Sequence, residues 1–125
     1  MNNLTIDAAW VLVVTFSLSL LYEIYRATLK AGTSRHDSLR TFFTQDLPLY
    51  IISAIVITIL FAGYDWSAWV GLIFSVVLIL LSIFYYNPVI MMERKPGLID
   101  WFEDLVYTGL LFVASALLIY EIAGK

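Results

Sequence analysis

Four residues near the start of the last apolar stretch of the sequence could act together on a cation or a proton. Asp100, Glu103, Asp104 and Tyr107 follow the i, i+3, i+4, i+7 spacing that places side chains on one face of a helix. Three carboxylates so placed can hold a hard cation such as Ca²⁺ or Mg²⁺, or can relay protons if they enter the membrane. A solvated helix start is the simpler interpretation, because carboxylates are favoured at the positive end of the helix dipole.

A second pair of candidate residues closes the first apolar stretch. Glu23 precedes Arg26 by about one helical turn, so an ion pair within the helix would hide both charges near the membrane surface. An ionisable residue within a membrane span is a functional candidate by default. The candidate polar residues are therefore Glu23, Arg26 and the acidic cluster, by which we mean Asp100, Glu103 and Asp104. We expect the cluster to pair with the basic residues of the first connection, Arg35 and Arg40.

The composition excludes several kinds of site. The chain has no Cys and a single His, His36, which excludes disulfides, zinc–thiolate sites, iron–sulfur clusters and a haem held by two His of this chain. The sequence shows no nucleophile–base pair, Gly-rich phosphate loop or metal-ligand spacing. We therefore expect no cofactor and no enzymatic activity. The formal net charge of −3 gives no reason to expect a nucleic acid as partner.

Four apolar stretches must position these residues. Of the 125 residues, 62% are hydrophobic and 14% are charged, and the mean hydropathy is +0.89. Soluble domains are nearer half apolar and a quarter charged, whereas one transmembrane helix takes about 20 apolar residues. The runs are continuous rather than alternating, which favours helices over a β-barrel. The sequence predicts an all-α, polytopic four-helix bundle in a single domain of residues 1–125, with spans at 6–25, 47–62, 67–86 and 101–122.

The connections predict two hairpins. Residues 63–66 have the composition of a tight turn, and Asn87-Pro88 predicts the end of the third span before a loop at residues 93–97. In the first connection, Asp37 is the predicted N-cap of a short interfacial helix that would lie on the membrane surface. Asp46 and Asp100 are the predicted caps of the second and fourth spans, the latter in a capping box with Glu103.

Positive charge predicts the orientation. Six of the seven Lys and Arg residues border the first or third connection, and the exception is Lys125. The positive-inside rule then places both connections in the cytoplasm and both termini on the other side. The N-terminus lacks the basic region of a signal peptide, so we expect the first span to stay in the mature protein. These features favour a prokaryotic cytoplasmic (inner) membrane, with membrane lipids around the chain.

Small residues recur every four positions on the second and third spans. They are Ala54, Thr58 and Ala62 on the second, and Ser67, Gly71 and Ser75 on the third. Small residues at this spacing let helix backbones approach closely in lipid. We expect these faces to pack within the chain, to dock onto helices of another subunit or of a second copy, or to do both.

A candidate internal repeat relates the two hairpins. The segment Gln45-Asp46-Leu47 resembles Glu103-Asp104-Leu105, and other matches fall at nearly the same offset. A duplicated hairpin would give this pattern, with parallel copies related by an axis along the membrane normal. Chance matching among apolar residues is the alternative.

The middle of the spans favours a supporting role. Its polar side chains are Ser and Thr only, and it has neither the paired helix breaks of a transporter nor a polar pore stripe. We therefore expect a non-catalytic accessory subunit that packs against and stabilises a catalytic or transporting membrane partner. The alternative is a self-assembling channel, holin-like pore or small transporter that uses Glu23 and the acidic cluster. An enzyme that attacks lipids through these carboxylates is the weakest hypothesis.

Overall fold

Four long helices make up the structure. The computed structural model describes residues 3–32, 37–94 and 96–124, and every secondary-structure element in these ranges is helical. In chain order the elements are α1 (Asn3–Thr28), α2 (Leu39–Thr41), the π-helical η1 (Phe42–Asp46), α3 (Leu47–Ala62), α4 (Ser67–Leu81), the π-helical η2 (Ser82–Met91) and α5 (Leu98–Ala123). Elements α2, η1 and α3 run on as one second helix, and α4 and η2 as one third helix. All four helices are long and apolar enough to cross a membrane, as the sequence predicts.

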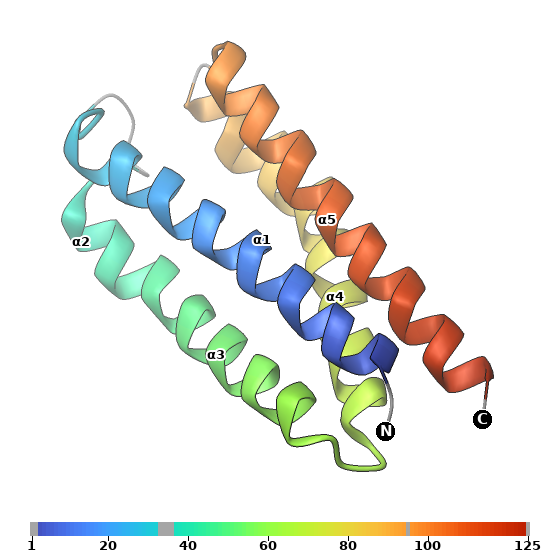
Figure 1. The fold of residues 1–125 in the computed structure, drawn as a ribbon. Helices are drawn as coiled ribbons and strands as arrows, with labels where there is room; N and C mark the ends of the chain where they lie inside the picture. The colour runs from blue at the N-terminus through green and yellow to red at the C-terminus, as the bar shows by residue number, and fades with distance from the viewer. Residues whose placement is uncertain (1–2, 33–36, 95, 125) are drawn as a thin grey trace.

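The helices form an up-and-down bundle in which each lies beside two others. Helix α1 packs against α5 and α3, and α4 packs against α3 and α5 (Figure 1). Figure 1 places both termini at the end of the bundle that carries the turn between α3 and α4. We call this the turn end. The two longer connections lie at the opposite end, which we call the polar end.

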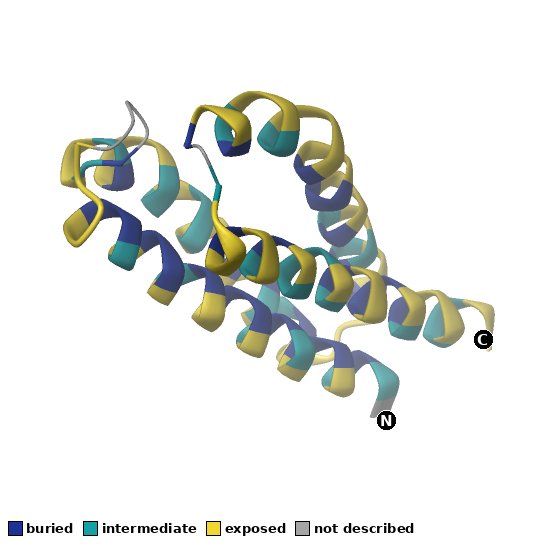
Figure 2. Cartoon of the chain, turned by 90° about the horizontal axis from the view of Figure 1, so that it is seen from above, coloured by how far each residue is buried: buried dark blue, intermediate teal, exposed yellow. Residues whose placement is uncertain are grey.

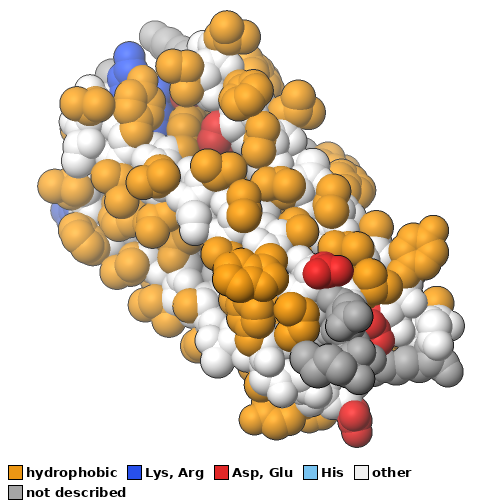
Figure 3. All heavy atoms as spheres, in the orientation of Figure 1, with side chains coloured by type: hydrophobic (Ala, Val, Ile, Leu, Met, Phe, Trp, Pro, Cys, Tyr) orange, Lys and Arg blue, Asp and Glu red, His pale blue; other side chains and the backbone are white. Residues whose placement is uncertain are grey.

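Hydrophobic side chains both fill the bundle and cover its outside. The core takes Leu12 from α1, Leu60 from α3, and Leu111 and Leu118 from α5, all fully buried. Buried residues face inward along every helix while exposed ones form the outer surface (Figure 2). Hydrophobic side chains also dominate the face seen in Figure 3. An outer surface this apolar is suited to lipid rather than water.

The turn end is tightly packed. Gly63 takes the left-handed conformation, with φ of 73°, and its N–H donates to the Ile59 carbonyl, which ends α3. The predicted tight turn is therefore confirmed. The Ser67 hydroxyl donates to the same carbonyl, with 2.8 Å between the two oxygens, and ties the start of α4 to α3. Ser67, Gly71 and Ser75 are all buried, so the small-residue face of the third helix packs within the chain.

The small-residue face of the second helix points outward instead. Ala54, Thr58 and Ala62 are exposed, and α3 buries Ser53, Val56 and Leu60. The expectation that these three residues pack within the chain is therefore wrong. Leu60 is the partner that fits against Gly71, and this contact turns the small-residue face away from the bundle.

The first connection also differs from the prediction. Residues 39–46 form the opening turns of the second helix rather than a separate interfacial helix. Ser38 is the N-cap, since its hydroxyl accepts the Thr41 N–H at 3.1 Å. Asp37 cannot cap because its side chain is drawn into the bundle, and Asp46 lies inside the helix without capping it.

The last two helix boundaries shift as well. The third helix continues through Asn87-Pro88 as the π-helical segment η2. A proline ring collides with the carbonyl four residues earlier in an α-helix, and the wider π turn relieves this collision. Helix α5 starts one turn before the predicted position, at Leu98. The predicted capping box of Asp100 with Glu103 is wrong, because Gly97 is the N-cap. Asp100 lies three residues after it, and its Oδ2 accepts the N–H of Gly97 at 2.8 Å.

A substitution at Gly71 tests the packing of the turn end. A Cβ there would lie 2.8 Å from Leu60 Cδ2 and 3.0 Å from Leu118 Cδ1, whereas at Gly109 it would meet nothing within 4 Å. We expect Gly71→Val to lower the free energy of unfolding in mild detergent by about 1–3 kcal/mol, the usual cost of overpacking. Gly109→Val, the matched control, should leave thermal unfolding nearly unchanged. Equal effects of the two variants would contradict this packing.

Candidate functional site

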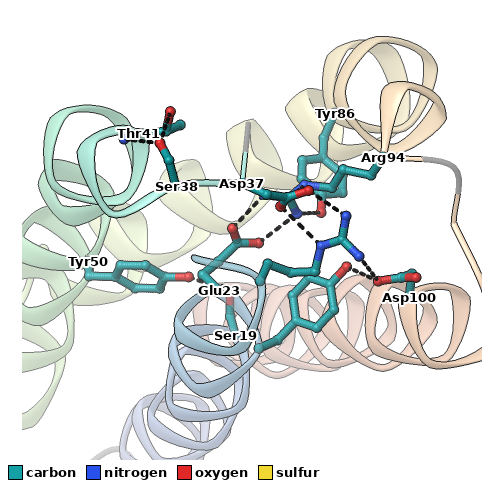
Figure 4. Close-up of polar contacts among 11 residues, drawn as sticks. Ser19, Glu23, Asp37, Ser38, Thr41, Tyr50, Tyr86, Arg94 and Asp100 are labelled. Carbon is teal, nitrogen blue, oxygen red and sulfur yellow. Dashed lines mark hydrogen bonds and ion pairs between the residues drawn. The ribbon is translucent and has the colours of Figure 1, made fainter. Parts of the chain in front are cut away.

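Arg94 is the first of two buried arginines at the polar end. It follows the third helix, and its guanidinium donates two hydrogen bonds to the Glu23 carboxylate of α1 (Figure 4). The distances are 2.8 Å from Nη2 to Oε1 and 3.1 Å from Nη1 to Oε2. Nη1 also donates to the Tyr86 hydroxyl at 2.9 Å. Burial disfavours the charged form of Arg94, but the hydrogen bonds to Glu23 and the negative charge of Glu23 outweigh this effect of burial. The pKa of Arg94 is therefore raised above its ordinary value. This two-pronged pair joins the third helix to α1.

Asp37 lies between the two arginines. Its Oδ1 and Oδ2 accept hydrogen bonds from Arg26 Nε at 3.0 Å and Nη2 at 2.5 Å. Arg94 Nε forms an ion pair with Oδ1 at 3.1 Å, out of line for a hydrogen bond. The Asp37 side chain is 0% exposed. One carboxylate from the first connection thus links α1 to the residue that follows the third helix.

Asp100 completes the set from α5. Its Oδ1 accepts the Tyr22 hydroxyl at 2.5 Å and lies 3.4 Å from Arg26 Nη1 (Figure 4). Its Oδ2 holds the start of α5 through Gly97, as described above. We call Glu23, Arg26, Asp37, Arg94 and Asp100 the ionic network. It joins α1, the first connection, the third helix and α5.

The network corrects the predicted pairings. Glu23 and Arg26 do not pair with each other, since each binds a partner from another part of the chain. A partner from another segment can place both carboxylate oxygens against two guanidinium nitrogens. Two residues on successive turns of one helix do not reach this bidentate geometry. Arg40, the predicted partner of the acidic cluster, is exposed, while Arg35 and His36 lie outside the described residues. Arg94 and Asp37 were not predicted as members of this site, although charged residues beside the spans of a chain with so few charges were a usable signal.

A cavity of about 360 Å³ adjoins the ionic network. Glu23 of the network lines it together with Asp46 from the second helix and Glu103 and Asp104 from α5. Four tyrosines and several hydroxyl groups complete its polar wall. The tyrosines are Tyr50, Tyr85, Tyr86 and Tyr107. The acidic cluster is therefore divided, because Asp100 serves the network and its other two members face the cavity.

Negative charge exceeds positive charge in this cavity. Arg94 is the single Lys or Arg among its described lining residues, and it is already bound to Glu23. None of the Lys or Arg residues that the structure describes forms an ion pair with Asp46, Glu103 or Asp104. Buried carboxylates without a cation cost free energy, so the cavity favours a proton or a cationic group. In the described ranges, no group of three or more acidic, His or Cys side chains is placed to hold a metal ion.

Both π-helical segments line this cavity. Segment η1 contributes Gln45 and Asp46, and η2 contributes Ser82, Tyr85 and Tyr86. π-helical turns are rare and occur frequently at functional sites, where they redirect side chains. Neither segment was predicted, and Asn87-Pro88 was the one sequence signal that the third helix departs from α-helical geometry.

The candidate repeat gains a structural counterpart. Asp46 and Asp104 hold equivalent positions in the two similar sequence segments, and both line the cavity from different hairpins. A duplicated hairpin would bring the two carboxylates together in this way. The duplication itself stays a hypothesis.

Comparison with known proteins adds no identity to this site. No family model, curated protein or solved structure matches the chain. The ionic network and the cavity are therefore the features from which a function can be inferred.

Removal of Arg94 tests the ionic network. We expect Arg94→Gln to lower the free energy of unfolding by about 3–5 kcal/mol, because Glu23 and Asp37 lose a buried cation. The measurement is thermal unfolding of the purified protein in mild detergent. Arg40→Gln removes an exposed charge and should change stability by less than about 0.5 kcal/mol.

A double variant separates the ion pair from general damage. Glu23→Gln combined with Arg94→Gln should be more stable than Arg94→Gln alone, since no uncompensated Glu23 charge remains. Glu23→Gln alone is the remaining variant of the set. If the loss of stability in the double variant equals the sum of the losses in the two single variants, Glu23 and Arg94 are not coupled and the ion pair is wrong.

Proposed function

We propose that the protein binds an organic cation of the ammonium type in the cavity at its polar end. The observation that carries this proposal is the excess of carboxylates over arginines among the described residues that line the cavity. Asp46, Glu103 and Asp104 supply negative charge, and the tyrosine rings supply the aromatic faces that attract ammonium groups. The absence of a metal-binding group among the described residues favours an ammonium over a metal ion.

The proposal belongs to the small transporter or channel hypothesis. It differs from the acidic-path version in one respect. Glu23 and Asp100 hold the bundle together, whereas Asp46, Glu103 and Asp104 line the cavity without a Lys or Arg partner among the described residues. The proposed role is to bind or move the ligand rather than to convert it chemically.

The Lys and Arg distribution supports a location for this site. We infer that the polar end faces the cytoplasm of a prokaryotic cell, with both termini outside, because the basic residues border the connections at that end. The cavity would then lie at the level of the inner leaflet.

Neutral replacements test cation binding. We expect Asp46→Asn combined with Glu103→Gln to weaken binding of tetramethylammonium by about tenfold or more, because the quaternary ammonium loses the coulombic attraction of two carboxylates and about 1.4 kcal/mol corresponds to tenfold in the dissociation constant. Isothermal titration calorimetry of the purified protein measures the dissociation constant. Glu121→Gln, at the far end of α5, is the matched control and should bind as tightly as the wild type. Absence of binding to the wild type would refute the proposal.

An accessory role is the second candidate, and one observation favours it. Of the apolar stretch of the second helix, 17% is buried within the chain, against 22% for the fourth helix and 39% for the first and third helices. Its small-residue face, Ala54, Thr58 and Ala62, points outward. Such a face permits close contact with a helix of another membrane subunit or of a second copy.

A bulky substitution on this face tests the accessory role. We expect Ala54→Phe to release the chain from a complex that survives purification from native membranes in mild detergent, because the ring prevents close helix contact. Ile55→Phe, at a neighbouring exposed position, is the control and should leave the complex intact. Size-exclusion chromatography with light scattering gives the mass of the complex. A wild type that migrates alone, without a partner, would exclude this role.

A further inference from the structure

The most exposed residues that line the cavity lie between the second and third helices. On its α1 and α5 wall, Ser19, Glu23 and Asp104 are buried, and Glu103 and Tyr107 are half-buried. Its exposed lining residues are Gln45 from the second helix, and Leu81 and Tyr85 from the third, with Leu81 48% exposed and Tyr85 52% exposed. The mouth therefore opens on the lateral surface of the bundle.

The two helices that flank this mouth approach each other at the turn end. Ser67 binds the Ile59 carbonyl there, and Gly71 lies against Leu60. Toward the polar end, the second helix and the third helix diverge (Figure 1), and the cavity occupies the space between their side chains. A mouth between two membrane-spanning helices faces lipid rather than water.

The lining changes from polar to apolar toward the middle of the membrane. Asp46 and Tyr85 lie on the polar side of the lining, whereas Leu49, Leu78 and Leu81 lie nearer the turn end along the same two helices. A ligand that fits this lining has a cationic head for the carboxylates and an apolar tail that leaves through the leucines. A compact, fully hydrated cation would contact the polar part of the wall and leave the leucines without an apolar partner.

We infer that the ligand is an amphipathic cation that enters sideways from the bilayer, between the second and third helices. This inference rests on the proposed cation-binding function and specifies the ligand class and its route. Its head group reaches Asp46, Glu103 and Asp104, while its tail stays against Leu78 and Leu81. An amphipathic cation partitions into the bilayer, so its concentration beside the mouth is raised. A cation without an apolar tail stays in water and is not concentrated there.

Two probes that share one head group test the route. Protein in phosphatidylcholine nanodiscs is titrated with tetramethylammonium and with decyltrimethylammonium, and the heats from empty nanodiscs are subtracted. We expect the wild type to bind the decyl compound about tenfold tighter or more, because the bilayer presents its head group at the mouth. Tetramethylammonium should bind weakly but measurably.

A matched pair of variants locates the mouth. Leu81→Trp narrows it, whereas Leu80→Trp adds the same ring at a position that is 49% exposed and does not line the cavity. We expect Leu81→Trp to weaken binding of the decyl compound about tenfold while tetramethylammonium binding stays unchanged. Leu80→Trp should change neither.

The outcomes separate this inference from the function on which it rests. If the wild type binds both probes equally, or Leu81→Trp affects both or neither, the lateral route is wrong while the cation site stands. If the wild type binds neither probe, the cation site itself fails. The comparison of the two probes on the wild type decides the inference even where Leu81→Trp unfolds.

Discussion

Charge buried at the end of an apolar bundle is the constraint on which the rest of the structure depends. A guanidinium in this environment is stable only where carboxylates surround it. In this chain the carboxylates come from separate segments. Arg94 takes Glu23 from α1 and Asp37 from the first connection, while Arg26 shares Asp37 and reaches Asp100. The helices at this end are positioned by ion pairs rather than by close contact of their backbones.

The two ends of the bundle consequently differ in character. At the turn end, Gly71 lets α4 approach α3 and α5, and small or branched apolar residues fill the interior. At the polar end, the network and the π-helical segments leave room between the helices, and this room is the acidic cavity. Close packing where the chain is apolar thus gives a rigid base for an open, charged site.

Local sequence signals were enough for the number of spans and for the turn between the second and third helices, but not for every helix boundary. Gly63 ends α3, and the apolar runs are long enough to leave no ambiguity about four helices. The site could not be predicted in the same way, because its contacts join residues far apart, such as Glu23 with Arg94 and Tyr22 with Asp100. Periodicity places residues on a helix face but does not say which face of another helix meets it. Those partners depend on how the four helices pack together.

The position of Arg94 also sets the order in which the chain can mature. Glu23 enters the membrane with the first helix, yet Arg94 follows 71 residues later, after the third helix. During synthesis, the first hairpin can already form the Arg26–Asp37 pair, but Glu23 must wait for its guanidinium. The third connection then brings Arg94 to Glu23 and Asp37, and α5 adds Asp100 last. The polar end is therefore complete only after the last helix has been made, and a chain that stops before Arg94 leaves Glu23 without the guanidinium that binds it.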